Sequence, residues 1–230
     1  MSALLNKKGR PFSWSHSAVN DFLGCPYRYA ARRFFCTVVD EKTEESLWGD
    51  RVHKALEERV RDGKELPEGM TQYENWARVL EALPGEFHFE KEFAVDGRLE
   101  PCGWFDKTAY GRVRIDLLIL DEETKTAVVI DYKTGKLKDD AEQLRLSCWF
   151  LSKFYPWIET FKYRYIWLKV GKPTGGEMTR REAMSVFTGT VEHLKRMEQA
   201  WEDEEFPMNP SGLCHGWCPV QDCPHWRKKR

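Results

Sequence analysis

Two aspartates and a lysine, Asp116, Asp131 and Lys133, could together hold a metal ion and assist hydrolysis. Asp131 follows the apolar run 128–130, and an acid in such a strand costs several kcal/mol of desolvation unless its charge is compensated. A divalent cation shared by two carboxylates supplies that compensation, and oxygen ligands suit Mg²⁺ or Mn²⁺. A nearby lysine can then orient or deprotonate a metal-bound water.

The two aspartates are predicted to lie on neighbouring strands of a hairpin. Residues 113–120 and 126–132 have the apolar, β-branched composition of strands, and the connection between them is short and polar. A loop of residues 122–125 would place Asp116 directly opposite Asp131. Like charges at opposing positions destabilise a sheet, so this register also favours a bound cation.

Lys133 follows Asp131 by two residues and shares its face, because side chains alternate along a strand. Taken alone, an aspartate at a strand end before Thr134 and Gly135 is often only a turn former. The lysine on the same face and Asp116 in register together favour a catalytic site.

The remaining pattern predicts helices and strands around this hairpin. Ser13 or Ser15 can cap a short helix that residues 24–26 interrupt before it continues over 27–35. The other expected helices are 47–61, 141–154 and 179–201, and the other expected strands are 87–93, 102–105 and 161–170.

The bulk composition is that of an ordinary globular protein. The 230 residues are 41% hydrophobic and 32% charged, and no apolar run approaches the roughly 20 residues of a membrane helix. The N-terminus has no apolar segment of a secretory signal, so we expect a cytoplasmic protein without a membrane span. A net charge of -1 means that any nucleic-acid binding must use local patches.

Several short motifs support a more specific reading, because they occur together and in one order. They are FSWS at 12–15 with CPYRY at 25–29, GDRVH at 49–53 with Glu57, GRVRID at 111–116, VVIDYKTG at 128–135 and QLRL at 143–146. This set resembles the RecB/AddB-like branch of the PD-(D/E)XK nuclease superfamily. The resemblance runs from residue 12 to 154, and to the end if the cysteines are counted.

The resemblance implies a Mg²⁺- or Mn²⁺-dependent deoxyribonuclease, an exonuclease or end-processing enzyme. It implies an α/β fold with a restriction-endonuclease-like core, a mixed central sheet flanked by helices, in a single domain over residues 1–230. The implied metal ligands are His53, Asp116, Asp131 and the backbone carbonyl of Tyr132, and Lys133 would lie beside the attacking water. On its own, His53 would be an ordinary helix histidine.

Three residues are expected to contact DNA. Gln143 begins a motif that helps position DNA in the family, although Ser147 stands where the family has tyrosine and Trp149 is the available substitute. Tyr27 and Arg28 could stack on and guide a single strand, or the tyrosine could belong to the core.

The cysteines predict a second metal centre. Cys214, Cys218 and Cys223 fall within ten residues of one another, a density of soft ligands that suits Zn²⁺ or an iron–sulfur cluster. AddB-type and CRISPR-associated adaptation nucleases add an N-terminal cysteine, which Cys25 matches, around a [4Fe-4S] cluster. The resemblance thus implies that residues 207–226 close onto the N-terminal helix. The spacing departs from that of those relatives, so zinc with His215 or His225 remains the alternative.

The expected partner is DNA, as ends or single strands, and the resemblance makes a helicase or recombination protein a candidate protein partner. Two alternatives stay open: a nucleic-acid-binding module that does not cleave, and an interaction protein stabilised by zinc. Metal analysis and a nuclease assay separate them.

Overall fold

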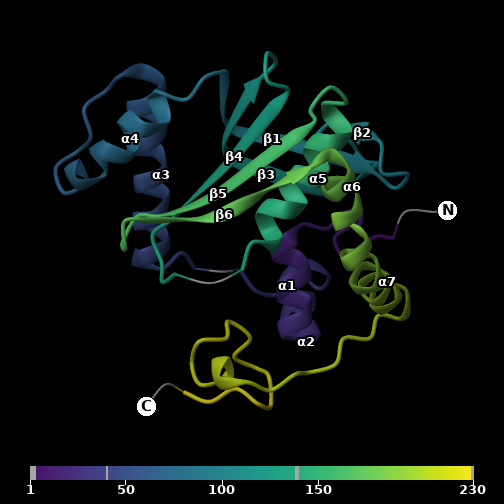
Figure 1. Ribbon diagram of the computed structural model, residues 1–230. Coiled ribbons are helices and arrows are strands. Elements are labelled where there is room, and N and C mark those ends of the chain that lie inside the picture. Colours follow the sequence, from purple (N-terminus) through teal and green to yellow (C-terminus); the bar gives the residue numbers. More distant parts are fainter. Residues whose placement is uncertain (1–3, 40, 138–139, 229–230) are drawn as a thin grey trace. The chain divides into compact units, whose positions relative to one another are not determined.

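The computed structural model describes residues 4–39, 41–137 and 140–228. Its main elements are α1 (His16–Gly24), α2 (Pro26–Arg33), α3 (Glu44–Asp62), α4 (Glu74–Glu81), β1 (Glu86–Asp96), β2 (Pro101–Cys102), β3 (Ala109–Asp121), β4 (Thr126–Lys133), α5 (Glu142–Phe154), β5 (Thr160–Trp167), β6 (Lys172–Thr179), α6 (Arg180–Val186) and α7 (Thr188–Asp203) (Figure 1). The strands form one sheet in the order β2-β1-β3-β4-β5-β6. The pair β4–β5 is parallel, whereas β3–β4 and β5–β6 are antiparallel. The prediction of an α/β fold with a mixed sheet flanked by helices is confirmed.

The chain divides into two compact units. Unit 1 comprises Met1–Glu41, Ala94–Arg112 and Thr188–Arg230, and unit 2 comprises Lys42–Phe93 and Val113–Phe187. Each of the two predicted metal centres draws its residues from one unit only. The assignment of residues 1–230 to a single nuclease domain stays a prediction.

The central hairpin of unit 2 has the predicted register. Asp121 pairs with Thr126, and the ladder continues to Leu117 opposite Ile130. Residues 122–125 form the loop, which the Lys125 amide closes by donating to the Glu122 carbonyl. Five consecutive pairs therefore lead toward the two aspartates that were expected to face each other.

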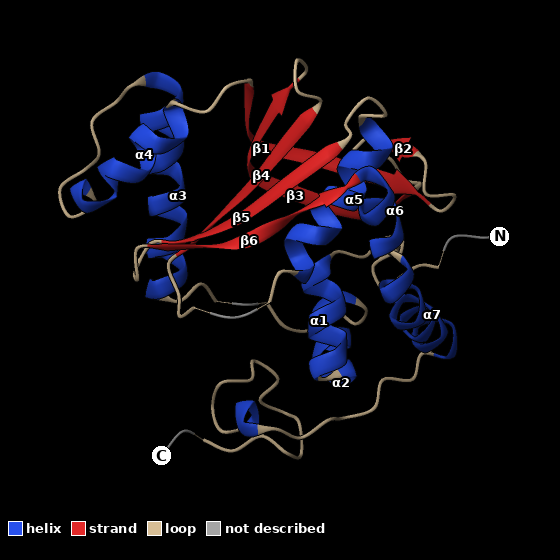
Figure 2. Cartoon of the chain, in the orientation of Figure 1, coloured by secondary structure: helices blue, strands red, loops and turns tan. Residues whose placement is uncertain are grey.

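Helix α3 forms one wall of the core of unit 2. The Thr43 hydroxyl caps its first turn by accepting from the Ser46 amide at 3.2 Å, and Gly63 ends it with a left-handed φ of 68°. Figure 2 shows α3 beside α4, with which it packs. The core around them consists of Val52, Leu56, Leu66, Met70, Tyr73, Ala77, Leu80, Leu117, Ile119, Ile130, Tyr132, Ile166 and Leu168. Burying each large apolar side chain contributes about 1.5–3 kcal/mol, which fixes α3 against the sheet.

Unit 1 joins the N-terminal helices to α7. Ser15 caps α1, and Cys25 separates α1 from α2, which begins at Pro26, where proline is favoured because a first-turn amide needs no partner. An edge-to-face contact of Phe34 and Trp201, with ring centroids 5.1 Å apart, ties α2 to α7.

Gly111 allows a close approach of backbone and ring within unit 1. Trp14 donates its amide to the Tyr110 carbonyl at 2.8 Å, and Arg112 donates to the Trp14 carbonyl at 3.0 Å. A Cβ atom at Gly111 would lie 2.8 Å from the Trp14 ring. The glycine of the GRVRID motif therefore accommodates the tryptophan of the FSWS motif.

The structure differs from the sequence predictions in several elements, and the strand expected over 161–170 already ends at Trp167. The strand expected at 102–105 ends at Cys102, because Asp106 accepts from the Gly103 amide at 2.7 Å and turns the chain. The helix expected over 179–201 begins at the predicted capping box but is interrupted at Phe187, between α6 and α7. The sequence reading also missed α4 and β6, and β6 contains two glycines and a proline, which strands disfavour.

None of the helices in the described part of the chain combines the length and the apolar character needed to cross a bilayer.

Candidate functional site

Asp116 of β3 is a largely buried carboxylate at the centre of the candidate site. Its Oδ2 atom accepts a hydrogen bond from the Tyr132 amide at 3.1 Å and lies 3.3 Å from His53 Nδ1, and the side chain is 16% exposed. Burial, and next the negative charge of Asp131, raise the pKa of Asp116 to about 7. The carboxylate therefore ionises with difficulty near neutral pH unless a cation lies beside it.

His53 of α3 brings its ring to the same place. Its Nε2 atom lies 2.7 Å from the Tyr132 carbonyl oxygen. A histidine nitrogen, a carboxylate oxygen and a backbone carbonyl oxygen thus converge from α3, β3 and β4. Gly49, one helical turn before the histidine, permits this approach, because a Cβ atom there would lie 3.3 Å from Thr134 Oγ1.

Glu90 of β1 joins this group, although the sequence reading did not select it. Ligand atoms of His53, Glu90 and Asp116 all lie within 4.8 Å of one another. Glu90 also pairs with Arg114 at 3.0 Å and has a left-handed φ of 49°, a conformation that costs about 1–3 kcal/mol and recurs at functional sites. The only sequence signal was the break in alternation after Phe89, where a regular strand would continue apolar side chains on one face.

Asp131 of β4 is 6% exposed and is held by Lys133 and Gln143. Its Oδ2 atom accepts from Lys133 Nζ at 3.0 Å and from Gln143 Nε2 at 3.0 Å. Its Oδ1 atom forms an ion pair with Lys133 Nζ at 2.7 Å but receives no hydrogen bond of good geometry from the described residues. This buried oxygen has room in its coordination for a cation, which fits a metal ligand.

The structure thus places the predicted residues in two adjoining sets. His53, Asp116 and the Tyr132 carbonyl form one, and Asp131 with Lys133 forms the other. Asp131 is outside the group whose ligand atoms lie within 4.8 Å, but its charge raises the pKa of Asp116 across the hairpin.

Gln143 of α5 connects Lys133 to a buried tyrosine of β5. Its Oε1 atom accepts from Lys133 Nζ at 3.3 Å and lies 3.5 Å from the Tyr165 hydroxyl. Lys133 Nζ also lies over the Tyr165 ring, 5.1 Å from its centroid. Tyr165 is the parallel-ladder partner of Asp131, and burial, with the charge of Asp131 next, raises the pKa of its hydroxyl. Sequence reasoning missed Tyr165 because the parallel pairing joins segments that α5 separates.

Neither residue considered for the family's tyrosine position offers an exposed aromatic ring. Ser147 donates its hydroxyl to the Gln143 carbonyl at 3.0 Å within α5. Trp149 is 2% exposed and stacks on Phe187, with centroids 4.4 Å apart. Tyr165 is the aromatic residue that contacts Gln143 and Lys133.

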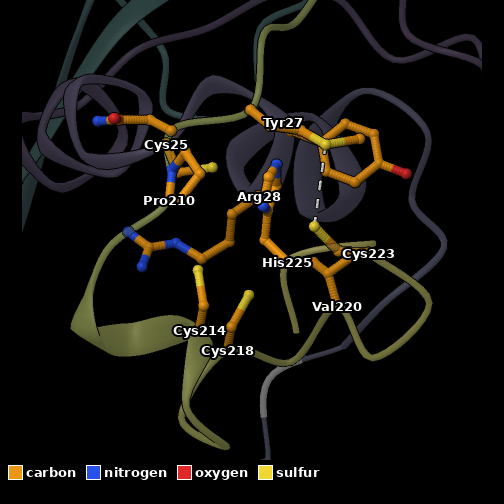
Figure 3. Close-up of a pocket in the computed structure, with 11 residues that line it drawn as sticks. Cys25, Tyr27, Arg28, Pro210, Cys214, Cys218, Val220, Cys223 and His225 are labelled. Carbon is orange, nitrogen blue, oxygen red and sulfur yellow. Dashed lines mark hydrogen bonds between the residues drawn. The ribbon is translucent and has the colours of Figure 1, made fainter. Parts of the chain in front are cut away.

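The four predicted cysteines line one pocket in unit 1. Cys25 comes from the junction of α1 and α2, and Cys214, Cys218 and Cys223 come from the C-terminal loop (Figure 3). The cavity is about 20 Å³, and burial raises the pKa of the Cys218 thiol. Among the residues described, no three of the thiols come within the 4.8 Å that separates the ligands of the acidic group.

Two residues predicted to contact DNA line this same pocket. The Arg28 side chain passes between Cys25 and Cys214, and its Nε atom donates to Asp21 at 2.9 Å (Figure 3). Tyr27 lies at the pocket edge, and burial, followed by the charge of Asp222, raises the pKa of its hydroxyl.

The sulfur spacing bears on which cofactor could fit. A tetrahedral zinc site with Zn–S bonds of about 2.3 Å needs sulfurs roughly 3.8 Å apart. No three of the described thiols are gathered within 4.8 Å of one another, although four thiols and His225 line the pocket. Thiolates and imidazoles are the donors that zinc and iron–sulfur clusters use.

Comparisons with known proteins agree with the fold. A family model for the PD-(D/E)XK nuclease superfamily matches residues 13–223. Among 25 matching chains of solved structures, the crystal structure of SSO0001 has 17% sequence identity and a TM-score of 0.46, covering 91% of this chain and 86% of that one. A protein from Eubacterium rectale, named "Putative exonuclease", has 14% identity and a TM-score of 0.52, covering 92% and 86%. No curated protein matches the chain.

Proposed function

The chain belongs to the PD-(D/E)XK nuclease superfamily, whose substrates are nucleic acids, and we propose that it is a Mg²⁺- or Mn²⁺-dependent deoxyribonuclease of the RecB/AddB-like branch, acting at DNA ends. The observation that carries the proposal is the convergence of His53, Asp116 and the Tyr132 carbonyl next to the buried Asp131–Lys133 pair. The raised pKa of Asp116 supports it, because a bound cation would offset the free-energy cost of ionising this buried carboxyl group.

Four groups would hold the metal ion: His53, Asp116, Asp131 and the Tyr132 carbonyl. When bound, the ion supplies a Lewis acid for a phosphate oxygen and lowers the pKa of the attacking water. Lys133, which is paired with Asp131, would orient that water and stabilise charge that develops on the phosphate. Gln143 holds both side chains in place.

We assign Glu90 as a further oxygen ligand of this site. It lies with His53 and Asp116 inside 4.8 Å, and its left-handed backbone directs the carboxylate away from the regular strand pattern. Arg114 forms an ion pair with it at 3.0 Å and so limits where the carboxylate can lie. Glu90→Gln should raise the Mn²⁺ concentration needed for half-maximal cleavage more than it lowers the rate at saturating metal.

The cysteine pocket is proposed to hold a structural cofactor, a [4Fe-4S] cluster, with Zn²⁺ as the alternative. Four thiols that line one pocket support it, and the resemblance to nucleases with a four-cysteine cluster is the reason to prefer the cluster over zinc. The role is structural because phosphodiester hydrolysis transfers no electrons. Protein purified without oxygen should be brown and carry about four irons per chain; colourless protein with one zinc would assign the pocket to zinc.

The experiment that tests the function uses end-labelled linear DNA and covalently closed circular DNA with Mn²⁺. We expect loss of the linear substrate and survival of the circle, since the proposed enzyme acts at ends. Cleavage of both would make it an endonuclease. Binding without cleavage under any divalent metal would favour the alternative of a non-cleaving nucleic-acid-binding module.

A further inference from the structure

A cavity of about 450 Å³ lies in unit 2 between α4 and the sheet. Its apolar lining includes Trp76, Leu80, Leu83, Val128, Ile130 and Ile166. Ile130 neighbours Asp131 along β4, and successive side chains of a strand point to opposite faces. The cavity therefore lies on the face of β4 opposite Asp131 and Lys133, and it is not a part of the candidate active site.

The size and lining of the cavity fit a bound organic group. Ligand pockets are usually about 300–1,000 Å³ and mainly apolar, with a few polar groups that fix orientation. Apolar walls that face a void forgo dispersion contacts, so a group that filled this space would regain them. Val79, at the cavity wall, is 49% exposed, which leaves a route from solvent.

Two cationic side chains also line the cavity. Lys162 and Arg164 of β5 stand beside Val128 and Ile130 in the parallel ladder. Lys162 is exposed and forms no hydrogen bond or ion pair with any residue that the structure describes. Arg164 donates from Nη1 to the Tyr163 carbonyl at 2.8 Å and also to the Gly176 carbonyl, which holds its guanidinium in place.

Asp121 also lines the cavity, but among the described residues it forms no ion pair with Lys162 or Arg164. The Asp121 carboxylate accepts from the Thr124 hydroxyl at 2.6 Å within the hairpin turn. Hydrogen bonds within that turn, first that of the Thr124 hydroxyl, lower the pKa of Asp121; the charge of Lys162 has a smaller effect in the same direction, without an ion pair. The charges of the lining therefore complement an anion placed next to an apolar group.

We propose that this cavity is a docking site for an acidic peptide segment of a partner protein. A large apolar side chain of the peptide enters the cavity beside Trp76 and Ile166, and neighbouring carboxylates bind Lys162 and Arg164. The mostly aliphatic walls suit a peptide better than nucleic acid, whose bases need hydrogen-bonding partners. The proposal does not depend on the chemistry of the active site.

The test is fluorescence anisotropy with a labelled peptide of sequence Asp-Asp-Asp-Leu-Phe that ends in a free carboxylate. The full-length protein should bind it with a dissociation constant in the micromolar range. Lys162→Glu should weaken binding at least tenfold, whereas Lys169→Glu, an exposed lysine outside the cavity lining, should leave binding unchanged. Both variants should have the circular-dichroism spectrum and the urea-unfolding midpoint of the wild type, which shows that the fold is intact.

A second peptide with Ser in place of Phe tests the apolar part and should bind at least tenfold more weakly. Equal binding of the two peptides, equal binding by wild type and Lys162→Glu, or no binding at millimolar concentration would each overturn the proposal. So would binding of 8-anilinonaphthalene-1-sulfonate without binding of either peptide, because the cavity would then take small organic anions.

Discussion

Gln143 donates its side-chain amide to Oδ2 of Asp131 at a distance of 3.0 Å. The residue that the sequence assigned to DNA contact therefore also holds the proposed metal-binding acid. Oδ2 accepts hydrogen bonds from Gln143 and Lys133, whereas Oδ1 has an ion pair with Lys133 at 2.7 Å but no hydrogen bond from the described residues, so Oδ1 has more room for a cation. Gln143 would then both contact DNA and orient the reacting groups.

Replacing Gln143 should impair turnover more than binding. Gln143→Leu removes the bonds to Asp131 and Lys133, so we expect the cleavage rate at saturating DNA to fall roughly 10- to 100-fold, as for other groups that orient metal ligands. KM for DNA should change less. Ser147→Ala, which loses only a hydroxyl bond within α5, is the matched control. A loss confined to KM would show that Gln143 acts on DNA alone.

The Tyr165 ring should matter more than its hydroxyl. The hydroxyl is 3.5 Å from Gln143 Oε1, a weak bond, whereas the ring faces the ammonium of Lys133. A partly buried cation–π contact contributes about 1–2 kcal/mol, so Tyr165→Leu should slow cleavage roughly 5- to 30-fold. Tyr165→Phe should remain near the wild-type rate. An equal loss in both variants would assign the effect to the hydroxyl.

The stability of metal-free protein should depend on pH through Asp116. Its pKa is about 7 in the folded state against an ordinary value of 3.8, so between these values the folded state binds more protons than the unfolded state. The free energy of unfolding should therefore fall as pH rises from about 4 to about 7, by at most about 4 kcal/mol. Urea unfolding should show this slope in the wild type and a smaller one in Asp116→Asn.

A divalent metal ion should restore the free energy of unfolding that the metal-free protein loses as pH rises. At pH 8, Mn²⁺ should stabilise the wild type against urea and should leave Asp116→Asn nearly unaffected. Equal stabilisation of the two proteins would place the ion elsewhere.

Close packing at Gly111 should make even a methyl group costly. A Cβ atom there would lie 2.8 Å from the Trp14 ring, so Gly111→Ala should destabilise the protein by about 1–3 kcal/mol in urea unfolding. Gly97→Ala, where a Cβ atom meets nothing within 4 Å, is the control and should have little effect. Wild-type stability in Gly111→Ala would mean that Trp14 shifts without cost.

The sequence specified the hairpin better than the residues around it. A four-residue loop fixes the register locally, which is why the approach of Asp116 and Asp131 could be predicted. Glu90 was missed, because the break in alternation after Phe89 signals an irregular strand but does not show which side chain the left-handed backbone redirects. Tyr165 was missed too, since parallel pairing across α5 is set by tertiary packing.

The sequence also predicted the cysteine pocket only in part. The cluster at 214–223 was evident from spacing, but only the family resemblance selected Cys25, about 190 residues earlier, as its partner. The contact of Arg28 with this pocket was not foreseen, because a basic residue near aromatics resembles a nucleic-acid contact in sequence.

The most direct test is the initial rate of Mn²⁺-dependent cleavage of end-labelled linear DNA by purified wild type, Asp131→Asn, Lys133→Met and the control Glu123→Gln, an exposed acid in the hairpin loop. Circular dichroism should show the same fold in all four proteins. We predict that Asp131→Asn and Lys133→Met each lose at least a thousandfold in rate, while Glu123→Gln retains the wild-type rate. Wild-type cleavage by either of the first two variants would contradict the assignment of this site to catalysis.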